Sequence, residues 1–257
     1  MNSWKSKKLP ISLTVIMPVF NEAERVAQAI EDILYSNLDL DIELIIVESA
    51  STDGTRQIVQ SYASKSNIIL IFQSEPKGKG SAVIEALKIA RNQVICIFDA
   101  DLEYHFNDVV DLLQPINDGQ TNFVLGSRWA GNSIRDFKTQ NWKGNLLNYA
   151  HVIGATLINI SFGIKTKDPF TMWKVFTRES IQDINFRCQR FDWDIEVIGE
   201  LALKGIKPIE IPASYKSRDY SQGKKIKFSR EVPILLKVIT VIFMKRIKQI
   251  TFGRAAT

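Results

Sequence analysis

The first half of the chain alternates short, wholly apolar runs with segments of helical periodicity, and this alternation constrains the fold most. The apolar runs expected to form strands are residues 13–17, 44–47, 68–72, 94–98 and 123–125. The segments with helical spacing are residues 22–35, 55–63, 81–91 and 108–116. Short strands without polar alternation are typical of a sheet that is covered on both faces. We therefore expect an α/β fold, with a mostly parallel central sheet and helices on both faces.

Composition excludes several other classes of protein. The chain has 257 residues, of which 45% are hydrophobic and 24% are charged, as in an ordinary globular protein. Disordered, collagen-like and multi-span membrane chains do not have this composition. Two cysteines, Cys96 and Cys188, are too few for a disulfide framework, and with two histidines they cannot form a structural zinc site of the usual spacing. A cytoplasmic location is consistent with this cysteine content.

Positive charge is concentrated toward the C-terminus. Residues 203–257 contain 13 Lys and Arg against 3 Asp and Glu, while the rest of the chain contains 20 against 25. Such a segment suggests an anionic partner, which could be a phosphorylated substrate, a lipid surface or a nucleic acid. The alternative is an ordinary solvated basic face.

Two further segments are expected to be amphipathic helices. Residues 144–164 have no formal charge, but their polar side chains make them a poor membrane span. Residues 233–250 place apolar side chains at helical spacing among four basic residues, Lys237, Lys245, Arg246 and Lys248. A helix of this kind can lie in the headgroup layer of a membrane or pack against its own domain. No secretory signal is visible at the start of the chain.

Polar residues follow three of the expected strands, at the carboxyl ends where open α/β sheets bind ligands. Asn21 and Glu22 follow the first strand, residues 48–55 follow the second, and Asp99 and Asp101 follow the fourth. We expect these three strand ends to border one crevice.

Asp99 and Asp101 are the central candidates for chemistry. Their carboxylates are two residues apart, and Glu103 adds a third oxygen ligand. Carboxylate oxygens are hard ligands suited to Mg²⁺ or Mn²⁺, ions that commonly bridge a protein and a diphosphate. The alternative is a solvated acidic turn.

Two other loops offer groups for a nucleotide. Glu48 and Asp53 could accept hydrogen bonds from a nucleobase, although Asp53 could equally cap the following helix. Lys79 and Gly80 precede a helix and offer charge and close backbone approach to a phosphate, in a pattern that is not a Walker A loop.

The second half of the chain adds further charged candidates. Arg128 could bind an anionic group or be an ordinary surface arginine. Asp192 and Asp194 lie among aromatic residues, where burial would raise a carboxyl pKa toward that of a general base, or they could stabilise a helix N-terminus. Arg218 and Lys224 belong to a basic loop that could bind phosphate or lipid.

Seven short motifs carry a resemblance: Pro18-Val19-Phe20-Asn21-Glu22, Ser51-Thr52-Asp53-Gly54-Thr55, Gly78-Lys79-Gly80 with Ala82, Phe98-Asp99-Ala100-Asp101-Leu102, Gly126-Ser127-Arg128, Asp168-Pro169 and Ser217-Arg218. In order and spacing they resemble the inverting glycosyltransferases of family 2, which have the GT-A fold. Within that family the dolichol- and polyprenol-phosphate sugar transferases are the most similar in these motifs.

The resemblance implies roles for individual residues. Those implied to bind the donor nucleotide are Pro18, Phe20, Asn21, Glu22, Glu48, Asp53, Lys79, Gly80, Asp99, Ala100 and Asp101. The implied metal ligands for Mg²⁺ or Mn²⁺ are Asp99, Asp101 and Glu103. The implied acceptor or phosphate ligands are Arg128, Asp168, Arg218 and Lys224. The catalytic residues would be Asp99, Asp101, Arg128 and Asp194. The base of the nucleotide, uracil or guanine, stays open.

The function expected from the resemblance is transfer of a sugar, with inversion, from a UDP- or GDP-sugar to a polyprenyl phosphate or a cell-envelope glycan. An acceptor phosphate needs no protein base, whereas an acceptor hydroxyl would need Asp194 or Asp192. Residues 1–228 would form the GT-A domain, and residues 229–257 would form a basic amphipathic tail that holds the protein on the cytoplasmic face of a membrane.

Two other functions are compatible with parts of the sequence. A nucleotidyltransferase that makes sugar nucleotides also uses a parallel sheet and acidic residues, but it would need a glycine-rich loop after the first strand, and residues 18–22 contain no glycine. A non-catalytic module that binds membranes or nucleic acid through the basic C-terminal segment is the other alternative.

Overall fold

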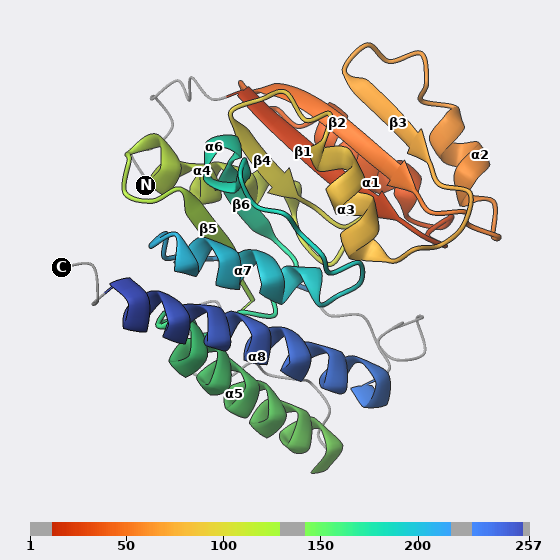
Figure 1. The fold of residues 1–257 in the computed structure, drawn as a ribbon. Coiled ribbons are helices and arrows are strands. Elements are labelled where there is room, and N and C mark those ends of the chain that lie inside the picture. The colour runs from red at the N-terminus through yellow and green to blue at the C-terminus, as the bar shows by residue number, and fades with distance from the viewer. Residues whose placement is uncertain (1–11, 129–141, 217–227, 254–257) are drawn as a thin grey trace.

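A seven-stranded sheet forms the centre of the protein (Figure 1). The computed structural model describes residues 12–128, 142–216 and 228–253. In chain order the strands are β1 (Ser12–Val19), β2 (Asp41–Glu48), β3 (Ile68–Phe72), β4 (Val94–Ile97), β5 (Phe123–Ser127), β6 (Lys174–Thr177) and β7 (Ile209–Pro212). Their order across the sheet is β3-β2-β1-β4-β6-β5-β7, and only β6 runs antiparallel to its neighbours. The expected α/β fold with a mostly parallel sheet is confirmed.

Helices connect the strands and cover both faces of the sheet. They are α1 (Val26–Leu34), α2 (Thr55–Gln60), α3 (Lys79–Leu87), α4 (Val109–Asn117), α5 (Trp142–Phe162), α6 (Arg178–Ile181), α7 (Trp193–Leu203) and α8 (Phe228–Gly253), with one 3₁₀ turn, η2 (Phe106–Asp108). The strands and helices expected in the first half are confirmed with small differences at their ends, as are the two long helices of the second half. Strands β6 and β7 were not expected from the sequence.

Two hydrophobic cores lie on opposite faces of the sheet because successive strand residues point to opposite sides. Val15 packs into the core beneath α1 and α4, whereas Ile16 packs into the core beneath α3 and α7. Since both faces of the central strands are buried, these strands carry few polar side chains, which explains their continuous apolar sequences.

Helices α5 and α8 form an outer layer over α7 (Figure 1). Val238, Ile239 and Ile242 of α8 are buried, and Gly199 of α7 leaves the space that Ile242 occupies. Arg246 of α8 donates hydrogen bonds to the carbonyl oxygens at the C-terminal end of α5. None of the helices in the described segments is both long and apolar enough to span a membrane.

Candidate active site

Strands β2, β1 and β4 lie side by side and in parallel, so their carboxyl ends meet at one edge of the sheet, as expected. The loops that follow β1 and β2 are joined by hydrogen bonds. The amide of Asn21 donates to Ser51 Oγ at 2.9 Å, and the amide of Ala23 donates to Asp53 Oδ2 at 3.1 Å. Asp53 Oδ1 also accepts from the amide of Thr55, at the start of α2. Asp53 therefore connects the two loops and binds the first amide of α2, whose N-cap residue is Gly54.

Glu48 ends β2 and is fully buried. Its carboxylate accepts hydrogen bonds from the amide of Ser51 at 2.6 Å and from Arg56 Nε at 2.5 Å. Arg56 also donates to the carbonyl oxygen of Gln73, and its guanidinium lies over the ring of Phe72, which is 39% exposed. The side chain expected to meet a nucleobase is therefore held by Arg56, which together with Phe72 offers partly exposed surface nearby.

Asp99 and Asp101 follow β4, where the chain turns sharply. Asp101 Oδ1 accepts a hydrogen bond from the amide of Glu103 at 3.0 Å, and Leu102 between them has a φ of 60°. The side chain of Asp99 is 18% exposed. Burial raises the pKa of Asp99, and the nearby positive charge of Lys79 opposes this rise. Two carboxylates thus stand at the edge of the sheet beside the ends of β1 and β2.

Glu103 lies close enough to Asp99 for its charge to raise the pKa of Asp99, but its carboxylate has another partner. It accepts a hydrogen bond from the hydroxyl of Tyr215 at 2.6 Å. In the described part of the chain no three His, Cys, Asp or Glu side chains are grouped closely enough to hold a metal ion. Asp99 and Asp101 nevertheless suit Mg²⁺ or Mn²⁺, because such ions are commonly held by one or two carboxylates together with substrate phosphates and water. The donor set therefore fits a metal that binds with the nucleotide.

Three charged groups with buried side chains, Lys79, Asp194 and Lys174, form a row beside Asp99. Lys79 Nζ lies 3.0 Å from Asp99 Oδ1 and 3.9 Å from Asp194 Oδ2. On the other side of Asp194, Lys174 Nζ lies 2.9 Å from Oδ1 and also donates to the carbonyl oxygen of Thr171. Burial alone would lower the pKa of Lys79, but Asp194 and Asp99 raise it overall, whereas burial prevails at Lys174 and lowers its pKa.

The glycine-containing segment that begins α3 packs against another segment of the chain. A Cβ on Gly80 would lie 2.7 Å from the carbonyl oxygen of Cys188. The amides of Gly80 and Ser81 donate to the carbonyl oxygens of Arg190 and Gln189, at 3.2 and 2.8 Å. The close approach expected at this glycine is therefore to another segment of the chain. Lys79, the first residue of α3, is the charged side chain of this segment that lies beside Asp99.

Arg128 and Asp168, expected separately as ligands for phosphate or acceptor, bind each other. Arg128 Nε donates to Asp168 Oδ2 at 2.7 Å and Nη2 donates to Oδ1 at 2.5 Å, in a buried bidentate pair. The amide of Asp168 donates to Glu210 Oε1 at 2.7 Å, and His151 Nε2 lies 3.7 Å from its carboxylate. Burial alone would raise the pKa of Asp168, but Arg128 lowers it overall. The Arg128 guanidinium also lies over the ring of Tyr215.

The remaining expected residues are placed as follows. Pro18 is half-buried within β1, and Phe20 beyond it is 37% exposed. Glu22 is buried near the start of α1, and Ala100 is buried between the two acids. Asp192 is buried and accepts from the amide of Arg190. Two basic residues, Arg218 and Lys224, lie outside the described residues.

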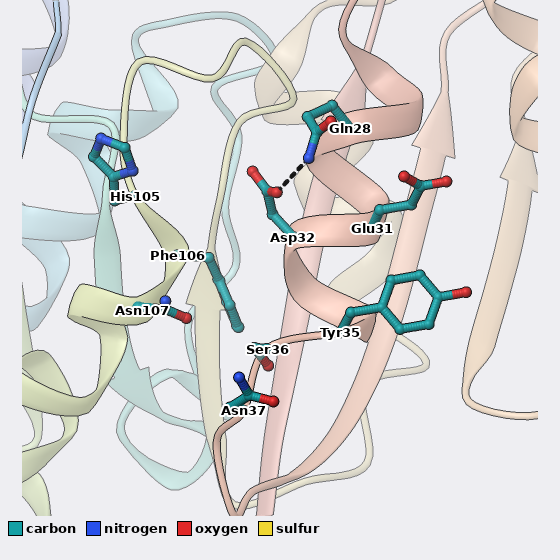
Figure 2. A pocket seen from close by; sticks show the side chains of 9 residues that line it. All are labelled: Gln28, Glu31, Asp32, Tyr35, Ser36, Asn37, His105, Phe106 and Asn107. Carbon is teal, nitrogen blue, oxygen red and sulfur yellow. Dashed lines mark hydrogen bonds between the residues drawn. The ribbon is translucent and has the colours of Figure 1, made fainter.

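A hollow of about 340 Å³ lies between α1 and the turn η2 (Figure 2). It is lined by Gln28, Glu31, Asp32, Tyr35, Ser36, Asn37, His105, Phe106 and Asn107. Gln28 and Asp32 are hydrogen-bonded to each other at its wall. None of the residues expected in the site lines this hollow, so it is separate from the edge where β1, β2 and β4 end.

Sequence reasoning did not assign roles to two of the cations in this region. Lys174 stands in the apolar run Trp173-Lys174-Val175-Phe176, where a single lysine indicates a buried charge that needs a partner. Arg56 follows the cap of α2 and gives no comparable signal, because an arginine in the first turn of a helix is most often exposed.

Comparison with known proteins supports the same fold. The solved structure of mannosyltransferase PcManGT from Pyrobaculum calidifontis, in complex with GDP-Man and Mn²⁺, superposes with a TM-score of 0.58 at 22% identity, covering 85% of this chain and 64% of that one. This similarity, together with the sheet order, establishes the GT-A fold.

Two curated relatives cover most of the chain. Glycosyltransferase AglJ of Haloferax volcanii is 27% identical over 81% of this chain, and the chain spans 64% of that relative, less than two thirds of its length. Dolichyl-phosphate beta-glucosyltransferase of Dictyostelium discoideum is 27% identical over 91% of this chain and 74% of its own.

The profile of one family, described as glycosyl transferase family 2, matches residues 14–184, which is more than half of the chain. The matched segment contains β1 to β6 and the acids that follow β4. This match favours a glycosyltransferase over a nucleotidyltransferase or a non-catalytic binding module. The chain therefore belongs to glycosyl transferase family 2.

Proposed function

We propose that the protein is a metal-dependent inverting glycosyltransferase that moves a sugar from a UDP- or GDP-sugar to a phosphate-bearing lipid. The proposal rests mainly on the position of Asp99 and Asp101, which follow the end of β4. Lys79 lies beside Asp99, and the hydrogen-bonded loops that follow β1 and β2 lie at the same edge of the sheet. Anionic oxygens and a lysine at this edge suit a nucleoside diphosphate, which open α/β sheets bind at such an edge.

Asp99 and Asp101 would hold Mg²⁺ or Mn²⁺. A bound dication supplies Lewis-acid stabilisation of the negative charge that grows on the departing diphosphate. Lys79 adds a further positive charge beside Asp99. The half-exposed Phe72 and the guanidinium of Arg56 offer a flat surface on which a nucleobase can stack.

The burial of Asp194 and its contacts with lysines support a phosphate as the acceptor. Its side chain is only 4% exposed and lies within 3.9 Å of two lysines. A general base must reach the proton that it removes, and Asp194 is enclosed between Lys79 and Lys174 with almost no exposed surface. An acceptor phosphate is already ionised and attacks the anomeric carbon without a base. A polyprenyl phosphate, as implied by the name of the Dictyostelium relative, is such an acceptor.

Helices α5 and α8 suggest how a lipid acceptor is approached. Both helices expose large apolar side chains: Tyr149, Val152, Ile153, Leu157, Ile160, Val232, Leu236, Val241, Phe243, Met244, Ile247 and Ile250. Exposed lysines of α8, Lys237 and Lys248, lie among them in sequence. We propose that residues 1–228 carry catalysis and that α8, with α5, lies in the headgroup layer of an anionic membrane, on its cytoplasmic face.

The membrane proposal predicts sedimentation of the protein with vesicles of phosphatidylglycerol, but not of phosphatidylcholine, at low salt. Added salt should weaken the binding because the electrostatic part is screened. Replacing Ile153 by Asp should weaken it roughly tenfold, since an exposed apolar anchor is lost and a like charge is added. Replacing Ile89, which is 40% exposed and lies outside α5 and α8, by Asp should change little. No sedimentation of the wild-type protein with anionic vesicles at low salt would contradict the proposal.

Donor binding is tested by the melting temperature of the purified protein in a panel of UDP- and GDP-sugars, with and without Mn²⁺. A ligand that binds only the folded protein raises its stability. The sugar nucleotides of one nucleobase, uracil or guanine, should raise the melting temperature. Mn²⁺ should enlarge this rise because the diphosphate shares the ion with Asp99 and Asp101. If no nucleotide sugar of either base shifts the melting temperature in the presence of Mn²⁺, the proposed donor is wrong.

A further inference from the structure

Lys79 stands where it competes with a metal ion. Its ammonium lies 3.0 Å from Oδ1 and 3.3 Å from Oδ2 of Asp99, so it contacts both oxygens of a carboxylate that the proposed function assigns to the metal. The like charges of an ammonium and a dication repel strongly in a buried environment, and Lys79 occupies both oxygens that the ion would use. Binding of the ion to Asp99 therefore favours movement of Lys79 toward another anionic partner.

Asp194 is such a partner. Its Oδ2 lies 3.9 Å from Lys79 Nζ, on the side away from Lys174. Asp194 Oδ1 already has Lys174 at 2.9 Å, whereas the buried Oδ2 makes no hydrogen bond to any of the described residues. A buried carboxylate oxygen without such a bond is costly, and a short movement of Lys79 would satisfy it.

Lys174 keeps Asp194 in place for this exchange. Lys174 is fully buried on β6 and is fixed between Asp194 Oδ1 and the carbonyl oxygen of Thr171. The cation on Oδ1 holds the carboxylate with Oδ2 directed toward Lys79. Lys79 thus forms ion pairs with Asp99 and Asp194, and of these two only Asp99 belongs to the proposed metal site, while the charge of Asp101 acts on Lys79 from farther away.

We propose that Lys79 exchanges between two partners, resting on Asp99 when no metal is bound and moving to Asp194 when a dication occupies Asp99. In this arrangement Asp194 is a positioning residue, because it acts on the metal site through Lys79. The inference rests on the proposed function only in taking Asp99 as a metal ligand. The exchange keeps each buried lysine paired with a carboxylate in both states.

The test is a double-mutant cycle on Mn²⁺ affinity, measured without nucleotide by the electron paramagnetic resonance signal of free Mn²⁺. Lys79→Met removes the competing cation and should tighten Mn²⁺ binding roughly three- to tenfold. Asp194→Asn removes the partner to which Lys79 would move and should weaken binding by a similar factor. In the Lys79→Met background, Asp194→Asn should change the affinity little, because the residue through which Asp194 acts is gone.

Simple electrostatics predicts a different result. If Asp194 only adds negative charge near the ion, Asp194→Asn weakens Mn²⁺ binding equally in both backgrounds, and that result overturns the exchange. Lys77→Met and Asp183→Asn are matched controls, because both side chains are exposed and neither approaches the metal site. Neither control should change Mn²⁺ affinity.

A second measurement needs no variant. In crystals of the wild-type protein grown with Mn²⁺, Lys79 Nζ should lie within hydrogen-bond distance of Asp194 and have left Asp99. Lys79 remaining on Asp99 beside a bound ion would overturn the inference while leaving the metal site intact. Failure of the wild-type protein to bind Mn²⁺ both without and with the nucleoside diphosphate would instead overturn the metal site itself, so the two failures are distinguishable.

Discussion

Replacing Asp99 by Asn is expected to lower the rate of sugar transfer by roughly 100- to 1,000-fold at saturating donor, the loss typical when one stabilising group at a developing charge is removed. Asparagine retains the shape of the side chain but supplies a neutral amide oxygen in place of a charged carboxylate. It also leaves Lys79 without its 3.0 Å partner and with the charges of Asp194 and Asp101 nearby. The measurement is initial-rate transfer from the UDP- or GDP-sugar that stabilises the wild-type protein, with Mn²⁺ and a polyprenyl phosphate.

Asp111→Asn is the matched control for this loss. Asp111 is an exposed residue of α4 and undergoes the same chemical change at a distance from the sheet edge. Its transfer rate should equal that of the wild-type protein. If Asp99→Asn keeps wild-type transfer in the presence of Mn²⁺, the assignment of this carboxylate to the metal and the diphosphate is wrong.

Replacing Asp168 by Asn is expected to lower the free energy of unfolding by about 3–5 kcal/mol, the usual cost of breaking a buried ion pair on one side. The change leaves the guanidinium of Arg128 buried without its bidentate carboxylate. The Asp168 side chain is completely buried, so water cannot replace the lost contact. Urea denaturation followed by circular dichroism measures the difference between the two proteins.

The same pair predicts a dependence on pH. The pKa of Asp168 in the folded protein lies below its ordinary value of 3.8, so its stabilising effect is complete above that value. The effect is lost as the pH falls below 3.8 and through the lowered pKa. The difference in unfolding free energy between wild-type protein and Asp168→Asn should therefore be constant near neutrality and narrow in acid.

The double variant Arg128→Met with Asp168→Asn tests whether the loss of stability comes from the unpaired guanidinium of Arg128. Removing both charges avoids the unpaired buried guanidinium, so the double variant should be more stable than Asp168→Asn alone. A double variant that is less stable by the sum of the two single losses would show that the two residues act independently, contrary to the paired geometry.

The fold was largely predictable because its signals are local. Each of the first five strands is an apolar run of the kind that a sheet covered on both faces demands, and each intervening helix has its own periodicity. The carboxyl-end rule then places Asn21, Asp53 and Asp99 at one edge without any knowledge of tertiary contacts. Strand β6 was missed because its run is short and contains Lys174.

The pairing of charges was not predictable in the same way. Arg128 and Asp168 are separated by 40 positions, and Lys79 and Asp194 by more than a hundred, so no local pattern connects them. Glu48 was expected to face a ligand because a buried acid at a strand tip is unusual. Its partner in the structure, Arg56, is only eight positions away. An arginine in the first turn of a helix is most often exposed, so the sequence does not indicate that this one pairs with a buried acid.

The most direct measurement is an anomalous difference map from crystals soaked with Mn²⁺ and the nucleoside diphosphate of the preferred base. We predict one strong manganese peak that contacts the carboxylates of Asp99 and Asp101 and the diphosphate oxygens together. A nucleotide bound elsewhere, with Asp99 and Asp101 in contact with bulk water and no manganese between them, would contradict the account.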